Sequence, residues 1–247
     1  MAITHHAGRT FDWAPRFDER SLNFRAAPQA VALPTGGRIW RTGPTLDQGE
    51  EGACVGFACA GEAAASPARV PNVTDAYARA WFHRAQYLDE WPGQDYPGTS
   101  VLAGCLVGRE RGCWSGFRWA KSAEEFASAV VRTGPGVAGI TWREDSYDTD
   151  ALGVLRASGA VVGGHAILVF GFIPAVPSQY MRNRLASLGL LDGFDSLGDA
   201  AFLVQNSWGS GWGKEGRALV PVSIMRDWVR ARAELAIPVG RRVPRAA

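Results

Sequence analysis

Residues 48–65 read QGEEGACVGFACAGEAAA, a short polar run followed by a segment that is apolar on nearly every side. Residues 54–65 predict an Ala-rich helix, and a helix without a polar face belongs in a protein core. Prolines at positions 67 and 71 end it. Cys54 therefore stands at the start of a buried helix, where unpaired backbone N–H groups and the helix dipole favour a thiolate.

The whole chain has 247 residues, enough for one large domain or two small lobes that share a core. Hydrophobic residues make up 47% and charged residues 20%, a composition typical of folded globular proteins. The 26 Lys and Arg against 24 Asp and Glu leave a formal net charge of +2, which gives no large electrostatic field. We therefore expect neither a nucleic acid nor a membrane as a partner.

Helices are expected in the first half of the chain and strands in the second. Further helices are predicted at residues 75–89, 100–109 and 122–132. Thr99 or Ser100 caps the second of these, and Ser122 with Glu125 forms a capping box on the third. Strands are predicted at residues 137–142, 161–173, 201–206 and 217–222. This order predicts an α+β protein of two lobes rather than alternating βαβ units.

The chain holds four cysteines and four histidines. The cysteines are too sparse for a disulfide scaffold and lack C-x-x-C spacing, so we expect no structural zinc. We also expect no other metal and no cofactor. Outside the helix start, we expect free core thiols at Cys59, Cys105 and Cys113. His83 lies among arginines on a predicted helix and is expected to be solvated or to pack rather than to act in catalysis. Acid–base chemistry near neutral pH therefore points to His165.

Two later stretches are candidates for a site with Cys54. Residues 163–169 read GGHAILV, which places His165 at the beginning of an apolar strand. Residues 205–213 read QNSWGSGWG, a strand end that runs into a Gly- and Trp-rich turn. Trp142 is expected to fill the core or the interface between lobes, or to line a cleft. Glu50 and Glu51 are expected in a solvated loop.

The chain resembles the papain-like cysteine peptidases, the C1 family, in three motifs that occur in the same order. These motifs are Gln-x5-Cys, then Gly-His-Ala on a strand, then Asn-Ser-Trp-Gly followed by Gly-Trp-Gly. The resemblance covers about residues 46–222. Gly98-Thr99-Ser100 before a helix and Gly134-Pro135 before a strand are similar to bacterial-type members. The resemblance implies a two-lobe α+β fold, with a helical lobe carrying the nucleophile helix packed against an antiparallel β lobe. The active site then lies in the cleft between the lobes.

The resemblance also implies the chemistry, which is hydrolysis of peptide bonds through a thioester acyl-enzyme on a polypeptide substrate. Cys54 would be the nucleophile, His165 its imidazolium partner and general acid, and Asn206 the residue that orients the imidazole. Gln48 and the backbone N–H of Cys54 would supply the oxyanion hole. The implied substrate-binding residues are Gly98, Thr99, Gly164 and Trp208, of which Trp208 would also cover the Asn–His hydrogen bond.

The expected organisation has three parts. Residues 1–45 form an extended N-terminal arm, and residues 46–222 form the papain-like domain, with a helical lobe at about 46–132 and a β lobe at about 133–222. The β lobe contains an insertion at 174–199, with a short helix at 179–188. Residues 223–247 form an Arg-rich C-terminal segment that is expected to be solvated. The insertion and this segment are candidate surfaces for a protein partner.

Three positions depart from the family pattern. Val55 follows the nucleophile where an aromatic residue is usual, and Gly164 precedes the histidine where a polar residue is common. Glu51 stands where secreted members place a disulfide cysteine. The arm is also too short for the usual inhibitory propeptide, so control by a long propeptide is not expected.

Two other functions fit the same residues. One is an amidase or isopeptidase that acts on a cell-wall or other amide. The other is a non-catalytic, papain-like structural or binding component of a larger assembly such as a virion. Residues 1–25 lack the apolar run of a signal peptide, and no stretch of about 18 apolar residues would span a membrane. We therefore expect a cytoplasmic protein, or one incorporated into an assembly.

Overall fold

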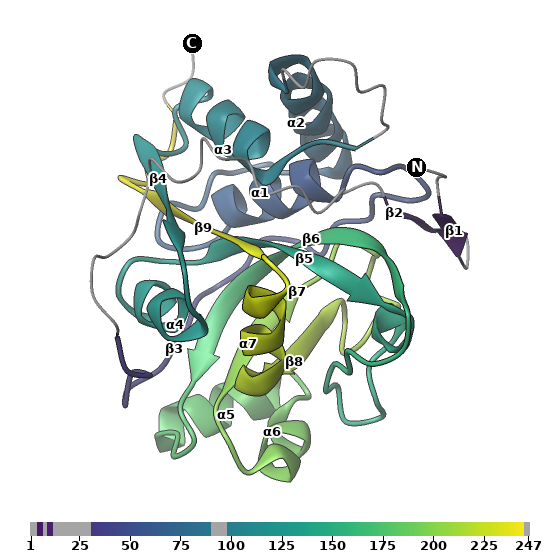
Figure 1. Ribbon diagram of the computed structural model, residues 1–247. Helices are drawn as coiled ribbons and strands as arrows, with labels where there is room; N and C mark the ends of the chain where they lie inside the picture. Colours follow the sequence, from purple (N-terminus) through teal and green to yellow (C-terminus); the bar gives the residue numbers. More distant parts are fainter. Residues whose placement is uncertain (1–3, 7–8, 12–30, 90–97, 245–247) are drawn as a thin grey trace.

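The computed structural model describes residues 4–6, 9–11, 31–89 and 98–244 (Figure 1). Much of the arm expected at residues 1–45 lies outside them. Within the arm, β1 (Thr4–His6) and β2 (Arg9–Phe11) form an antiparallel pair. The last part of the arm contributes β3 (Arg38–Ile39), which pairs with β6 (Val161–Ile173). This end of the arm therefore belongs to the main sheet.

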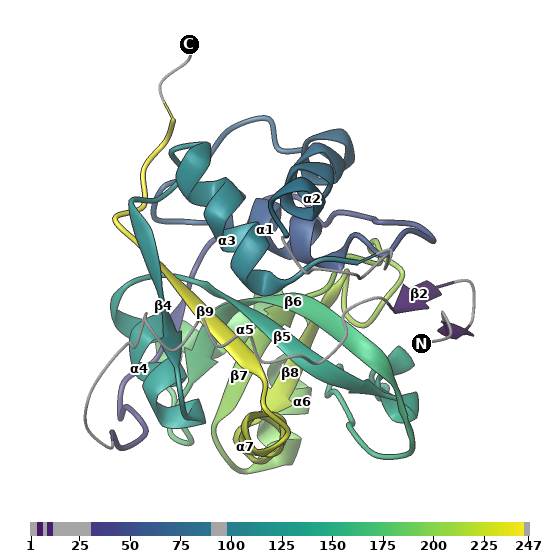
Figure 2. The same ribbon diagram turned by 45° about the horizontal axis from the view of Figure 1, so that its top comes forward.

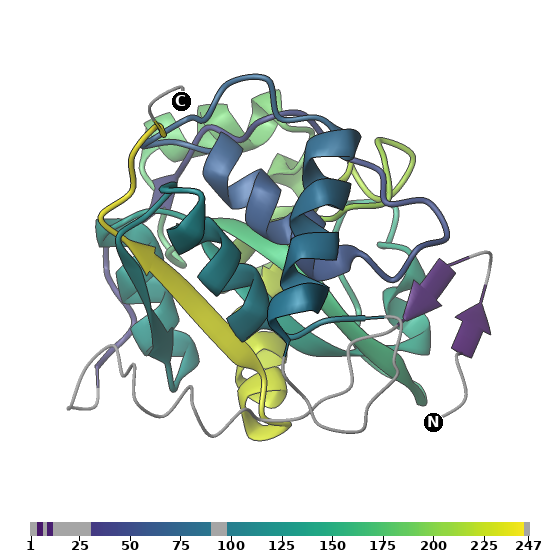
Figure 3. The ribbon, with the colours of Figure 1, turned by 90° about the horizontal axis from the view of Figure 1, so that it is seen from above.

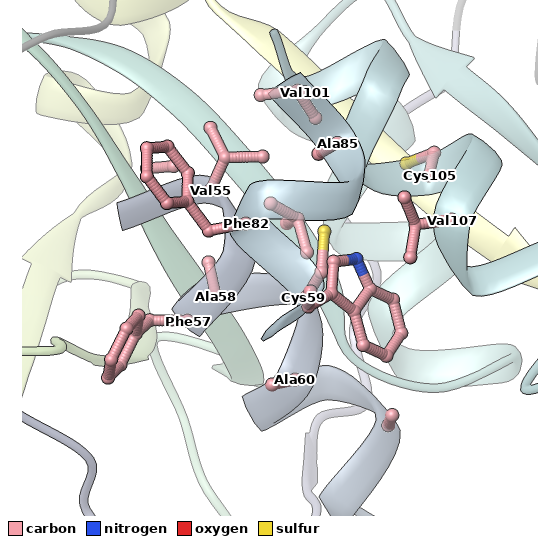
Figure 4. Close-up of a cluster of buried hydrophobic side chains, with 14 of the residues drawn as sticks. Val55, Phe57, Ala58, Cys59, Ala60, Phe82, Ala85, Val101, Cys105 and Val107 are labelled. Atoms are coloured by element: carbon pink, nitrogen blue, oxygen red, sulfur yellow. The ribbon is translucent and has the colours of Figure 1, made fainter. Parts of the chain in front are cut away.

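Three helices form the lobe at the top of Figure 1: α1 (Cys54–Ala64), α2 (Asp75–Leu88) and α3 (Val101–Glu110). Seen from above, they lie in front of the sheet (Figure 3). Every residue of α1 is buried, as its apolar sequence predicts. Figure 4 shows the cluster that surrounds α1, including Phe82 of α2 and Cys105 of α3. The same cluster contains residues of four strands, so it joins the helical lobe to the sheet; these residues are Phe117, Trp119, Val137, Ala166 and Ala236.

Polar side chains fix where three of the predicted helices begin. Thr74 accepts a hydrogen bond from the N–H of Tyr77 before α2, and Ser100 accepts one from the N–H of Ala103 before α3. The Ser122 hydroxyl likewise accepts from the N–H of Glu125 at 3.0 Å and caps α4 (Ala123–Arg132). The predicted helices are therefore confirmed.

One main sheet makes up the second lobe. Its strand order is β4 (Gly116–Ala120), β9 (Glu234–Val239), β5 (Gly136–Arg143), β6, β7 (Ala201–Gln205) and β8 (Arg217–Pro221), with β3 beside β6. All the strand pairs that the structure describes in it are antiparallel. The four predicted strands correspond to β5, β6, β7 and β8 and are confirmed.

Strand β9 is absent from the sequence prediction, and the sheet continues past the boundary expected at residue 222. Figure 2 shows β9 between β4 and β5. Its sequence contains Pro238, and a proline in a strand argues for an edge position. The structure resolves this conflict because β5 pairs with β9 only over residues 234–236. Pro238 therefore lies beyond the part of β9 that is flanked on both sides.

Helices cover both faces of the sheet. Alternate residues of β7 face opposite sides, and Phe202 and Val204 share a buried cluster with α4 and α7 (Val222–Arg230). Ala201 and Leu203 share another with α5 (Gln179–Ser187) and α6 (Leu191–Leu197). A short 3-10 helix, η2 (Glu144–Tyr147), follows β5.

The predicted insertion therefore folds as α5 and α6 and packs on the sheet, with a helix close to the expected limits. Val176 and Tyr180 are its exposed large apolar side chains. A partner surface on this segment stays a prediction. Among the described residues, the structure has no helix that is long and apolar enough to cross a bilayer.

The expectation of a solvated Arg-rich C-terminal segment is wrong for Arg241. Its side chain is 5% exposed, and its Nε lies 2.6 Å from Oε1 of Glu62 in α1. The same guanidinium donates to the carbonyl oxygens of Thr133 and Pro135. A buried carboxylate requires such a cationic partner. Glu62 and Arg241 are 179 residues apart in the sequence, so no local pattern predicts their pairing.

Candidate active site

His165 and Asn206 form the best-defined contact of the site. His165 lies on β6 and is fully buried, and Asn206 directly follows β7, the neighbouring antiparallel strand. The His165 Nε2 lies 2.7 Å from the Asn206 Oδ1. An amide oxygen only accepts hydrogen bonds, so in this bond the imidazole Nε2 carries the proton and donates it. The N–H of Ser207 also donates to Oδ1, at 2.8 Å, which fixes the orientation of the Asn206 amide.

Two indole rings enclose the imidazole. The ring centroids of Trp142 and His165 lie 4.7 Å apart in an edge-to-face arrangement, and those of His165 and Trp208 lie 4.8 Å apart. Both tryptophans are buried. They exclude water from the His165–Asn206 hydrogen bond, which strengthens it. Trp208 therefore packs against the imidazole, and its role in substrate binding stays a prediction.

The contact between Trp142 and the imidazole was not predicted. Trp142 was expected to fill the core or to line a cleft. On β5 it lies opposite Gly163 of β6, one diagonal step from His165. Only the register of β5 against β6 could have revealed this contact, because the two residues lie on different strands. The sequence alone does not show how these strands pair.

Gln48 is held against the same turn that carries Asn206. Its N–H donates to the carbonyl oxygen of Ser207 at 2.9 Å, and the N–H of Gly209 donates to the carbonyl oxygen of Leu46 at 3.0 Å. The Ser207 hydroxyl donates to Oε1 of Gln48 at 2.6 Å, and Nε2 of Gln48 donates to the carbonyl oxygen of Glu51 at 2.7 Å. An amide nitrogen carries two hydrogens, and Glu51 takes one of them.

Cys54 is the first residue of α1, as predicted, and it is 2% exposed. Ala53 gives α1 no side-chain cap, and the first turn of α1 contains no Asp or Glu. The positive end of the helix dipole favours an anion there. Helix α1 packs on β6, and Ala166, the residue after His165, belongs to the same buried cluster as Cys54.

The departure at Val55 has a packing reason. A Cβ atom at Gly104 of α3 would lie 2.6 Å from Cγ1 of Val55 and 2.9 Å from Sγ of Cys59. Helix α3 therefore approaches α1 closely at this point, and Val55 fills the available space.

The other predicted binding residues lie on two segments. Thr99 is buried before α3, where its hydroxyl donates to Oδ2 of Asp89 at 2.9 Å. The carbonyl oxygen of Gly98 accepts from Nε2 of Gln86 at 3.4 Å. Gly164 pairs with Thr141 on β5. Their role in substrate binding stays a prediction. Within the described residues, no group of three or more His, Cys, Asp or Glu could hold a metal ion.

The fold is similar to that of solved cysteine proteases, although no family model and no curated protein matches the chain. Xylellain, a cysteine protease from Xylella fastidiosa, aligns with a TM-score of 0.61 at 13% identity and covers 98% of this chain and 100% of that one. The bromelain protease from Ananas comosus aligns with a TM-score of 0.52 at 14% identity, covering 84% and 99%. Digestive procathepsin L 3 of Tenebrio molitor aligns with a TM-score of 0.53 at 14% identity, covering 94% and 76%.

Proposed function

We propose that this chain, which has the two-lobe α+β fold of papain-like cysteine proteases, is itself a cysteine peptidase. The observation that carries the proposal is the hydrogen bond between His165 and Asn206, with two tryptophan rings packed against the imidazole. His165 lies on β6, the strand against which the helix that begins at Cys54 packs. Gln48 lies beside it with its amide oriented by two partners. These residues supply a nucleophile, a proton carrier, an orienting group and an oxyanion donor.

In the acylation step, the Cys54 thiolate attacks the carbonyl carbon of the peptide bond. The carbonyl oxygen gains the negative charge and accepts hydrogen bonds from the second Nε2 hydrogen of Gln48 and from the backbone N–H of Cys54. His165 then donates its Nδ1 proton to the departing amine, the C–N bond breaks, and a thioester remains on Cys54.

In the deacylation step, the neutral Nδ1 of His165 accepts a proton from water while the water oxygen attacks the thioester. The C–S bond breaks, the carboxylic acid product leaves, and the thiolate–imidazolium pair is restored. Asn206 holds Nε2–H throughout, so that the same nitrogen, Nδ1, faces the reacting atoms in both steps.

Selective alkylation tests this proposal. At pH 6 we expect iodoacetamide to label Cys54 at least about 100-fold faster than the other three cysteines, because only a thiolate reacts rapidly. The others are at most 1% exposed. The hydrogen bond with Cys59 and burial raise the pKa of Cys105 well above its usual range, and burial raises the pKa of Cys113. Peptide mapping by mass spectrometry measures the labelling at each site.

The His165→Ala variant is the matched comparison, and it should lose the selective labelling of Cys54. Slow and equal labelling of all four cysteines would contradict the peptidase proposal and favour a non-catalytic component of an assembly. Selective labelling without cleavage of a peptide library would instead favour an amidase or isopeptidase that uses the same residues.

A further inference from the structure

We propose that Arg79 is a positioning residue for the oxyanion donor, because it holds the loop at residues 48–51 in the conformation that orients the Gln48 amide. The inference rests on the proposed peptidase function and assigns a role to the ion pair of Arg79 with Glu51, a residue expected from the sequence in a solvated loop. Arg79 touches no reacting atom. It acts through Glu51 and Gln48.

The orientation of the Gln48 amide depends on where the Glu51 carbonyl lies. The Gln48 Nε2 donates one hydrogen to this oxygen at 2.7 Å, and its second hydrogen is the one assigned to the oxyanion. The Ser207 hydroxyl fixes only the oxygen of the amide. Displacing the Glu51 carbonyl would therefore rotate Nε2 away from the substrate, even with the bond to Ser207 intact.

Arg79 contacts both ends of this loop. Its Nε lies 2.7 Å from Oε2 of Glu51, and its Nη2 lies 3.4 Å from the carbonyl oxygen of Gln48. A single guanidinium thereby fixes the separation between the residue that carries the amide and the residue that accepts from it. Guanidinium suits this role because its donors form a rigid planar fork.

Three residues along one stripe of α2 contact the loop or the residue before it. Asp75, Arg79 and His83 are spaced four residues apart, which places them above one another on the helix surface. The Asp75 carboxylate accepts from the N–H of Asp47 at 3.0 Å, and Nε2 of His83 lies 3.7 Å from Oε1 of Glu51. Helix α2 therefore serves as the support for the loop, with Arg79 at its middle.

Loss of the Arg79–Glu51 ion pair is expected to affect catalysis more than folding stability. The Arg79 and Glu51 side chains are 41% and 31% exposed, and an ion pair of such exposure contributes little to folding stability. In contrast, a misplacement of about 1 Å in an active site can cost on the order of 10²-fold in rate.

The Arg79→Ala variant is expected to lose about tenfold in kcat/KM for peptide hydrolysis, part of the 10²–10³ that a complete oxyanion donor contributes. The rate of Cys54 alkylation by iodoacetamide should stay within about twofold, because alkylation forms no oxyanion and needs only the thiolate. Arg84→Ala is the matched control. Arg84 lies on the same helix at 39% exposure and pairs with Glu110 at 3.0 Å, away from the loop. It should change neither rate.

A double-mutant comparison separates positioning from a general structural role. In a Gln48→Ala background the donor is already absent, so adding Arg79→Ala should cost less than about twofold more. Glu51→Gln, which keeps the backbone carbonyl, should show the same loss as Arg79→Ala. Arg79→Lys should restore only part of it.

Three results would overturn the inference. The first is a wild-type kcat/KM in both Arg79→Ala and Glu51→Gln. The second is an equal loss from Arg79→Ala with and without Gln48. The third is a fall in Cys54 alkylation that matches the fall in hydrolysis. If the unchanged protein neither cleaves peptides nor labels selectively at Cys54, the peptidase proposal itself fails, and this inference with it.

Discussion

A Cys54→Ala variant is expected to hydrolyse peptides more slowly than the unchanged protein by a factor on the order of 10⁴–10⁶, because losing the nucleophile of a catalytic unit removes nearly all of its effect. The substitution removes one buried sulfur atom and leaves the helix start intact, since Ala is the best helix former. The fold should therefore persist. Release of a fluorescent amine from peptide substrates measures the rate, and circular dichroism verifies folding.

Cys59→Ala provides the comparison for this variant. Cys59 lies five positions further along α1 and is also fully buried. Its replacement should leave hydrolysis within about threefold and lower the stability by about 1 kcal/mol, as for other small deletions in a core. Full activity in Cys54→Ala, or an equal loss in Cys59→Ala, would show that Cys54 is not the nucleophile.

An Arg241→Ala variant is expected to lose about 3–5 kcal/mol of folding stability at neutral pH, because it leaves the Glu62 carboxylate buried without its cation. Glu62 and Arg241 side chains are 1% and 5% exposed, so water cannot replace the missing partner. Urea denaturation followed by tryptophan fluorescence measures the loss. Arg242→Ala is the control, because Arg242 is exposed and donates to the carbonyl oxygen of Gly112 at 3.1 Å.

The loss in Arg241→Ala should depend on pH in a definite direction. Burial raises the pKa of Glu62, and Arg241 opposes this rise by its charge and its hydrogen bond. Without Arg241 the pKa rises further in the folded state. A carboxyl group with a raised pKa contributes stability that is present below its unfolded value, near 4.3, and is lost as the pH rises through the folded value. The deficit should therefore be smallest in acid and grow towards neutral pH. A deficit independent of pH would contradict this account.

Much of the fold could be predicted because its signals are local. The apolar run of α1 and the long, nearly continuous apolar stretch of β6 predict those elements nearly to the residue. The caps at Ser100 and Ser122 mark helix starts because a hydroxyl bonds to a backbone N–H only three positions away.

The remaining features depend on contacts between distant segments. The environment of His165 includes Trp142 because of the register between β5 and β6. The pairing of Glu51 with Arg79 depends on which stripe of α2 faces the loop. Local sequence patterns give neither the register of the two strands nor the orientation of α2. The catalytic roles of Cys54, His165, Asn206 and Gln48 stay predictions that the proposed assays decide.

The position of β9 also determines when the protein can finish folding during its synthesis. Strand β4 has β9 as its neighbour in the sheet, and β9 also pairs with β5. A nascent chain that has not yet emerged from the ribosome beyond residue 233 lacks this strand and the arginine that neutralises Glu62. The segments that carry Cys54 and His165 thus leave the ribosome long before the sheet that supports them is complete. The main sheet is therefore completed only after the residues of β9 have been made.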